Sequence, residues 1–384
     1  MSYVTRRKVG EQPLWQHGTP LLGRLDVELT ERCDNDCVHC CICLPERDEE
    51  AERREMSTAE VQAVLTEAAA LGALSVRFTG GEPLLRDDFE DLYLFARRLG
   101  LKVLIFTNAR HVTPALVDLL ARIPPRVTME VTVYGMHAES YEAVTRAPGS
   151  FAQFRRGVDL LLERRIPFVV KSALLPQNRA ELDEFETWAA TIPWMTKAPG
   201  HSMFFDLRNR RDDPEKNRLV ASLRLTPEDG VAVLTRDAER YRKGMVEFGS
   251  KFMRPPGDVL FGCGAGCGLS VDAYGRAQPC MGVRAPGLTV DLAEKTLSDA
   301  LDHFSTLREM RATNPEYLRR CARCFLKGLC EQCPAKSWAE HGTYDTPVEY
   351  LCDVAHAQAR WLGWLKDGEK GWEVAEWRQR LEAT

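Results

Sequence analysis

Apolar and polar positions alternate in two different periods along the first half of the chain. Residues 25–29 alternate one by one, which is typical of a strand with one buried face. Similar patterns predict further strands at residues 75–79, 102–106, 128–134 and 167–174. Helices are expected in the intervals, over residues 57–71, 87–99, from 114, from 151 and over 179–190. Ser57 and Glu60 form a capping box that marks the first of these helix starts.

Strands and helices that alternate with short turns favour parallel strands joined by right-handed crossovers. The pattern fits a barrel as well as a doubly wound sheet. In both folds, ligands bind at the carboxyl ends of the strands.

The pattern weakens from residue 194 to residue 257, where only Thr226–Asp229 marks a clear helix start. We expect a connecting segment here that lines the substrate entrance. Residues 354–364 and 372–381 predict helices, and packing explains their tryptophans more simply than a cofactor does.

Composition narrows the functional classes. The 384 residues, 44% of them hydrophobic, suit one large domain and a smaller one. A net charge of -5 disfavours nucleic-acid binding, and the local group Arg208, Arg210 and Arg211 is more simply a solvated loop. No apolar run approaches the ~20 residues that span a bilayer, and residues 1–10 lack the apolar core of a signal peptide. These features predict a cytoplasmic protein without membrane contact.

The thirteen cysteines form two groups, with none between residues 43 and 263. Thiols stay reduced in the cytoplasm, so metal binding is expected before disulfides. In the first group, Cys33, Cys37 and Cys40 can hold three corners of a cubane iron-sulfur cluster and leave the fourth iron open. A zinc site that uses His39 is the alternative, although His39 lies between two candidate ligands. Two further cysteines of this group are interpreted as spare buried thiols, Cys41 and Cys43.

A glycine-rich turn ends the second predicted strand. It consists of Gly80, Gly81, Glu82 and Pro83. It lacks the Lys-Ser/Thr of a phosphate loop, but adjacent glycines let backbone approach a ligand closely. The tetrapeptide alone is a weak signal, and its place one crossover after the cysteines strengthens it.

The cysteine loop and this turn together resemble the radical S-adenosylmethionine (SAM) enzymes. The resemblance implies a partial (β/α)6 TIM-like barrel in which SAM binds the open iron and is cleaved to a 5'-deoxyadenosyl radical. The catalytic cluster ligands are then Cys33, Cys37 and Cys40. The residues expected to contact SAM are His39, Gly80, Gly81, Glu82, Pro83, Asn108, Thr132 and Arg146. Tyr134 stands where the family has Asp, so Thr132 is either a SAM contact or an ordinary strand residue, with equal weight. Arg146 is expected to pair with the SAM carboxylate.

The second cysteine group resembles the SPASM extension of radical SAM enzymes, a C-terminal iron-sulfur cluster domain, although its last short gap is two residues instead of three. The resemblance implies two auxiliary 4Fe-4S clusters, three clusters in all. One set of ligands is Cys263, Cys267, Cys280 and Cys333. The other set is Cys321, Cys324, Cys330 and Cys352. A zinc knuckle built from the two Cys-x2-Cys pairs is the alternative, and it leaves four cysteines unexplained.

The expected domains are an N-terminal extension (1–20), a radical SAM core (21–195), a connecting segment (196–257), the auxiliary-cluster domain (258–355) and a helical tail (356–384). Most SPASM proteins modify peptides, so we expect a ribosomally made peptide substrate, with a crosslink, thioether or epimerisation as the product. Sulfatase maturation is disfavoured because Met281 follows Cys280, where those enzymes place Asp.

The resemblance also implies partners. One is an electron donor such as flavodoxin or ferredoxin. Because little sequence precedes the first strand, leader recognition is expected to need either a separate leader-peptide-binding protein or another surface of this chain. An enzyme of small-molecule or cofactor biosynthesis and a zinc-bound interaction scaffold remain as alternatives.

Overall fold

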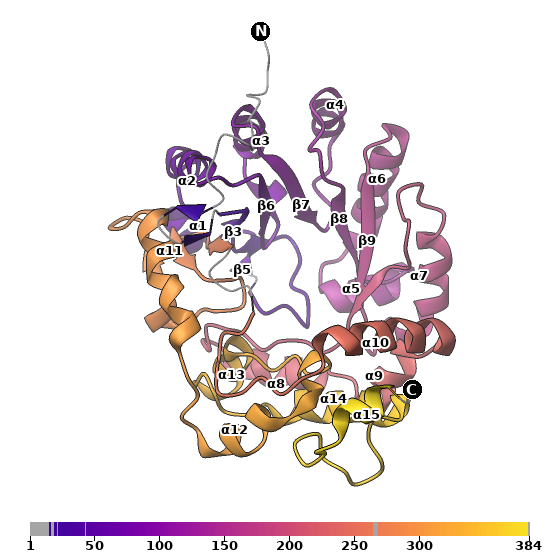
Figure 1. Cartoon of the computed structure of the whole chain (residues 1–384). Coiled ribbons are helices and arrows are strands. Elements are labelled where there is room, and N and C mark those ends of the chain that lie inside the picture. The colour runs from indigo at the N-terminus through magenta and orange to yellow at the C-terminus, as the bar shows by residue number, and fades with distance from the viewer. Residues whose placement is uncertain (1–14, 17–18, 21, 43, 264–267, 383–384) are drawn as a thin grey trace. The chain divides into compact units, whose positions relative to one another are not determined.

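The computed structural model describes residues 15–16, 19–20, 22–42, 44–263 and 268–382 (Figure 1). The chain folds into two compact units that are interleaved in sequence. Unit 1 comprises Met1–Ser202 and Ala265–Ser305, and unit 2 comprises Met203–Gly264 and Thr306–Thr384. Among the described residues, no helix has the length and apolar character to cross a membrane.

Unit 1 is built on a nine-stranded sheet with the order β10-β9-β8-β7-β6-β3-β11-β12-β13. The first seven strands in this order are parallel, and β12 and β13 are antiparallel additions. The bounds are β3 Arg24–Thr30, β6 Ser75–Gly80, β7 Lys102–Thr107, β8 Met129–Val133, β9 Phe168–Ala173, β10 Gly200–Ser202, β11 Leu269–Val271, β12 Arg276–Gln278 and β13 Val290–Asp291. Two short pairs accompany this sheet, β1 Trp15–Gln16 with β2 Thr19–Pro20 and β4 Arg32–Cys33 with β5 Leu44–Pro45.

The helices of unit 1 cover one face of this sheet, and Figure 1 shows α2, α3, α4, α6 and α7 along the outside of the strands. Val76, Phe78 and Val131 on that face are buried and apolar. The opposite face carries charges, including the ion pairs Arg77–Asp26 (3.5 Å) and Lys171–Glu130 (3.1 Å). Helices on a single face and polar side chains on the other are the arrangement of a barrel wall.

The helices of unit 1 are α1 Glu49–Arg54, α2 Thr58–Ala70, α3 Phe89–Arg98, α4 Pro114–Arg122, α5 Ala138–Thr145, α6 Ser150–Glu163, α7 Leu182–Ala189 and α11 Leu297–Ser305. Three single turns of 3-10 helix join them, η2 Pro83–Leu85, η3 Arg179–Glu181 and η4 Pro286–Leu288. The predicted strands and the five predicted helices of this half are confirmed. Their ends agree within about two residues, except that α7 begins three residues later than expected, after the 3-10 turn η3. The Ser57 and Glu60 capping box is present, with hydrogen bonds of 2.7 and 3.3 Å. Apart from the two short strand pairs and the 3-10 turns, three elements described above for this half were not predicted, namely α1, α5 and β10.

Unit 2 is helical. Its helices are α8 Pro214–Ser222, α9 Pro227–Leu234, α10 Ala238–Phe252, α12 Pro315–Arg319, α13 Pro334–His341, α14 Glu349–Leu362 and α15 Trp377–Glu382, with the 3-10 turns η5 Thr306–Glu309, η6 Cys321–Arg323 and η7 Phe325–Gly328. Its buried core includes Phe325, Leu326, Leu362 and Trp364. The helix expected over residues 354–364 begins earlier, at Glu349, and therefore contains Cys352. The helix expected from residue 372 begins only at Trp377.

Candidate functional site

The first cysteine loop follows β3 and is held by α5. The backbone N–H of Asp36 donates to the Thr145 carbonyl (2.8 Å), and that of Val38 donates to the Val144 carbonyl (3.0 Å). A further backbone bond closes the loop internally, from Cys40 to Cys37 at 3.1 Å. The three predicted cluster ligands therefore lie on a segment that the end of α5 fixes in place.

The glycine turn holds the same loop from the side of β6. The N–H of Gly81 donates to the Thr30 carbonyl (2.8 Å), and the N–H of Glu82 donates to the Arg32 carbonyl (2.9 Å). A Cβ on Gly80 would lie 2.0 Å from the Thr30 oxygen, and one on Gly81 would lie 2.1 Å from the Arg32 oxygen. The chain's own backbone thus requires both glycines, a reason separate from the predicted contact of the turn with SAM.

Glu82 is buried behind this turn, and Pro83 begins the short helical turn η2 that follows. The Glu82 carboxylate accepts hydrogen bonds from the Thr107 hydroxyl (2.8 Å) and the backbone N–H of Asn108 (2.7 Å). Burial, together with the nearby charge of Asp34, raises the pKa of Glu82 to about 7. Glu82 therefore joins the turn to the end of β7.

Asp34 is the functional candidate that the sequence analysis missed. Its carboxylate accepts from the Asn108 side-chain amide at 2.7 Å and pairs with Arg110 (3.1 Å) and His111 (3.2 Å). Burial opposes ionisation, but the hydrogen bonds from His111 and Asn108 and the charge of Arg110 hold the pKa of Asp34 below its usual value. Its position directly after Cys33, with Arg and His directly after the Asn108-Ala109 pair, is the signal available in the sequence.

The remaining predicted SAM contacts have defined surroundings in unit 1. The His39 ring lies 5.8 Å from that of Tyr134, centroid to centroid. Thr132 is half-buried on β8, beside Lys171 of β9. Arg146, in a left-handed conformation (φ 52°) at the end of α5, donates to the Asp36 carbonyl (2.8 Å) and pairs with the Asp36 carboxylate (2.6 Å). Its predicted bond to the SAM carboxylate would therefore be an additional role.

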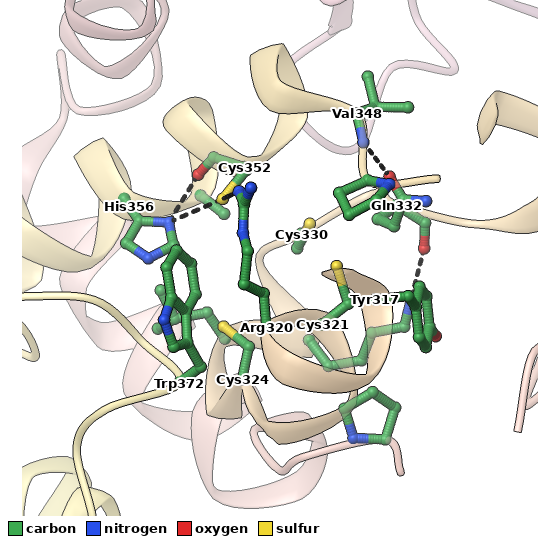
Figure 2. Close-up of a pocket in the computed structure, with 15 residues that line it drawn as sticks. Tyr317, Arg320, Cys321, Cys324, Cys330, Gln332, Val348, Cys352, His356 and Trp372 are labelled. Carbon is green, nitrogen blue, oxygen red and sulfur yellow. Dashed lines mark hydrogen bonds between the residues drawn. The ribbon is translucent and has the colours of Figure 1, made fainter. Parts of the chain in front are cut away.

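Unit 2 contains a cavity that is lined by cysteines. Figure 2 shows four of them around one space, Cys321, Cys324, Cys330 and Cys352. They come from η6, its C-terminal cap, the segment after η7 and helix α14, and they are the set predicted for one auxiliary cluster. Cys333, which was assigned to the other cluster, is outside this lining and caps α13 instead.

The chemistry of this cysteine set fits an iron-sulfur cluster. Four thiols around one space match the ligands of a 4Fe-4S cluster. Burial raises the pKa of Cys321 and Cys324 to about 12, and the neighbouring thiolates add to this effect. Loading iron must therefore displace protons from these thiols.

The C-terminal tail covers this cavity, which the sequence did not indicate. The Nδ1 atom of His356 lies 2.7 Å from the Cys352 carbonyl oxygen. The backbone N–H of Gly371 donates to His356 Nε2 (3.0 Å), and Trp372 lines the cavity. A Cβ on Gly371 would lie 2.7 Å from Cys324 Sγ. The tail is therefore packed directly on a predicted ligand.

The second predicted auxiliary set stays a prediction. Cys267 lies outside the described residues, as does Cys43 of the first group. Cys263 and Cys333 belong to unit 2 and Cys280 to unit 1. Cys41 is half-buried in the first loop.

Comparison with known proteins shows what this chain is similar to. Residues 27–189 match the Radical SAM superfamily. AdoMet-dependent heme synthase of Methanosarcina barkeri is 24% identical over 341 residues, which cover 83% of this chain and 92% of the relative. PqqA peptide cyclase of Rhizobium meliloti is 26% identical over 337 residues, which cover 84% of this chain and 85% of the relative.

A solved structure supports the fold. SuiB of Streptococcus suis, bound to S-adenosylmethionine, superposes with a TM-score of 0.62 at 17% identity, over 88% of this chain and 78% of SuiB. The expected α/β partial barrel is thereby confirmed.

Proposed function

We propose that the chain, whose residues 27–189 match the Radical SAM superfamily, is an enzyme that modifies a ribosomally made peptide, using SAM at a 4Fe-4S cluster held by Cys33, Cys37 and Cys40. The observation that carries the proposal is the double attachment of the cysteine loop, to the turn at residues 80–82 and to the end of α5. Three thiols on a fixed loop leave one iron of such a cluster open for SAM. When bound, the cluster and SAM supply a 5'-deoxyadenosyl radical.

The chain's own residues position these groups. Asn108 and Asp34 hold the loop at Cys33, and Glu82 holds the glycine turn that faces it. His39, Thr132 and Arg146 are proposed to contact SAM, with Arg146 as the charged partner for its carboxylate.

The auxiliary clusters belong to the same proposal. The cavity set in unit 2 would hold one of them, Cys321, Cys324, Cys330 and Cys352. The other would use Cys263, Cys267, Cys280 and Cys333. With every iron ligated by cysteine, the proposed roles are electron transfer and shaping of the substrate cavity. An electron donor such as flavodoxin or ferredoxin and a separate leader-peptide-binding protein are the proposed partners.

PqqA peptide cyclase, by its name, acts on a peptide, and its match extends over most of both chains. This supports the peptide as the leading substrate class. AdoMet-dependent heme synthase matches over a similar length and favours a second candidate, an enzyme of small-molecule or cofactor biosynthesis.

One incubation separates the two candidates. The reduced enzyme is given SAM and a short peptide encoded beside its gene, and 5'-deoxyadenosine and the peptide mass are measured. Stimulated 5'-deoxyadenosine formation with loss of two hydrogens supports a crosslink, and gain of one deuteron in deuterated water supports epimerisation. An unmodified peptide, together with consumption of a small metabolite, would favour the second candidate instead.

A further inference from the structure

Arg320 lies beside the cysteine-lined cavity of unit 2. Its Nη2 donates to Cys352 Sγ at 3.7 Å, and Figure 2 shows the side chain reaching across the cavity toward Cys352. Its guanidinium lies 4.8 Å from the centre of the Trp372 ring. Only 14% of the side chain is exposed. A positive charge is thus placed next to a sulfur that is proposed to ligate iron.

Glu349 orients this guanidinium. Its two carboxylate oxygens accept from Arg320 at 2.7 and 2.8 Å, a bidentate geometry that fixes the plane of the guanidinium. Glu349 is 63% exposed, so water screens much of its charge. Arg320 is shielded, and its charge acts on the cavity more strongly than that of its partner.

The potential of an iron-sulfur cluster depends on net charge, on hydrogen bonds to its sulfurs and on exposure to water. Arg320 supplies a positive charge and a hydrogen bond at Cys352, and Trp372 limits exposure of the cluster to water. A nearby positive charge and an N–H donor both stabilise the reduced, more negative cluster. We propose that Arg320 is a positioning residue that raises the reduction potential of the cluster at Cys321, Cys324, Cys330 and Cys352. The inference rests on the proposed function, which places a cluster there.

The test uses the full chain with Cys33, Cys37 and Cys40 replaced by Ala, so that only auxiliary clusters contribute to the spectra. Anaerobically reconstituted protein is titrated with reductant, and midpoint potentials are read from the electron paramagnetic resonance signals. The signal that changes in Cys352→Ser identifies the cluster of interest. Arg320→Gln is expected to shift its midpoint to a more negative potential, and Arg320→Lys to shift it less. Glu349→Gln, which removes the counter-charge, is expected to shift it to a more positive potential.

Arg218→Gln is the matched control. Arg218 lies on α8 of the same unit, is exposed and pairs with Glu215 at 3.6 Å, so its loss is expected to leave the midpoint unchanged. Iron content and thermal stability are measured for every variant. If Arg320→Gln and Glu349→Gln both keep their iron and neither changes the midpoint potential, Arg320 has a purely structural role and the inference is overturned. If Arg320→Gln loses its iron, the midpoint potentials of Arg320→Lys and Glu349→Gln are used instead, and the absence of a change in both overturns the inference. Absence of iron from these cysteines in the parent chain would instead refute the proposed cluster, and the inference with it.

Discussion

Asp34 ties the cysteine loop to the residues that follow β7. Its carboxylate is bound by Asn108, Arg110 and His111, which all come from one short segment. Arg110 also donates to the Asn35 side chain at 2.7 Å, so two consecutive loop residues are held by the same guanidinium. A loop fixed in this way loses less freedom when it binds a cofactor, which favours binding.

Glu82 gives the site a pH dependence that can be measured. Burial raises its pKa from 4.5 to about 7 in the folded chain. The folded state therefore binds a proton more tightly than the unfolded state does. The stability that Glu82 contributes is fully present below pH 4.5 and is lost as the pH rises toward 7, by up to about 3 kcal/mol.

Glu82→Gln removes this titration. The free energy of unfolding is measured for wild type and for Glu82→Gln by anaerobic denaturant titration of the iron-free chain. The stability of wild type relative to Glu82→Gln is expected to fall as the pH rises from about 5 to about 7. Taking the difference cancels the contributions of other titrating groups. A difference that stays constant over this range would mean that Glu82 keeps an ordinary pKa.

Arg146 is predicted to contribute to SAM affinity. Arg146→Ala should weaken binding by about 1.5 to 3 kcal/mol if the guanidinium reaches the SAM carboxylate. Equilibrium binding of SAM to the reconstituted enzyme measures this. Arg164→Ala is the control, because Arg164 is an exposed arginine that pairs with Asp118 on the helices of the same unit. Unchanged affinity in Arg146→Ala would restrict Arg146 to its bonds with Asp36.

At the scale of elements, the sequence predicts what depends on local periodicity. The strands at 25–29 and 75–79 were recognised because one face of each is buried against helices, which imposes alternation on the sequence. The helix at Glu349 was placed too late, because its first turn carries Cys352 instead of an apolar repeat. The tail contact was not predictable, since it joins Gly371 to Cys324, far apart in the chain, and depends on tertiary packing.

The tail is predicted to help retain the cluster that it covers. In Gly371→Ala, the new methyl group would lie 2.7 Å from Cys324 Sγ and 2.9 Å from the Leu326 side chain, so one of them must move. Overpacking of this kind costs about 1 to 3 kcal/mol. We expect a lower melting temperature and less iron per chain after anaerobic reconstitution.

Gly244→Ala is the control for this change. Gly244 lies in helix α10 of the same unit, with open space where its Cβ would be, so alanine is expected to be neutral or slightly stabilising. Equal iron content and stability in the two variants would show that the tail packs loosely over Cys324.

At the scale of the whole molecule, the cysteine motifs predict chemistry more directly than architecture. The spacing of Cys33, Cys37 and Cys40 suggests an open cluster, because spacing alone limits which thiols can share one site. The division into two units is not encoded in this way. Residues 268–305 pack with the barrel and residues 203–263 pack with the C-terminal helices, and no local pattern predicts that exchange. The pattern of apolar and polar positions also could not distinguish a barrel from an open sheet. The structure distinguishes them, because the helices of unit 1 cover only one face of its sheet.

The cysteine sets also predict the number of clusters and their division of labour. Eleven of the thirteen cysteines fall into one set of three and two sets of four, so anaerobically prepared protein should bind about twelve irons. Replacing Cys33, Cys37 and Cys40 together by Ala should leave about eight irons and abolish formation of 5'-deoxyadenosine, because only the cluster with an open iron can bind SAM. Cys41→Ala, in the same loop, should keep both the iron and the activity. Stoichiometric zinc in place of iron would support the scaffold alternative, and 5'-deoxyadenosine from the triple variant would move SAM cleavage to another site.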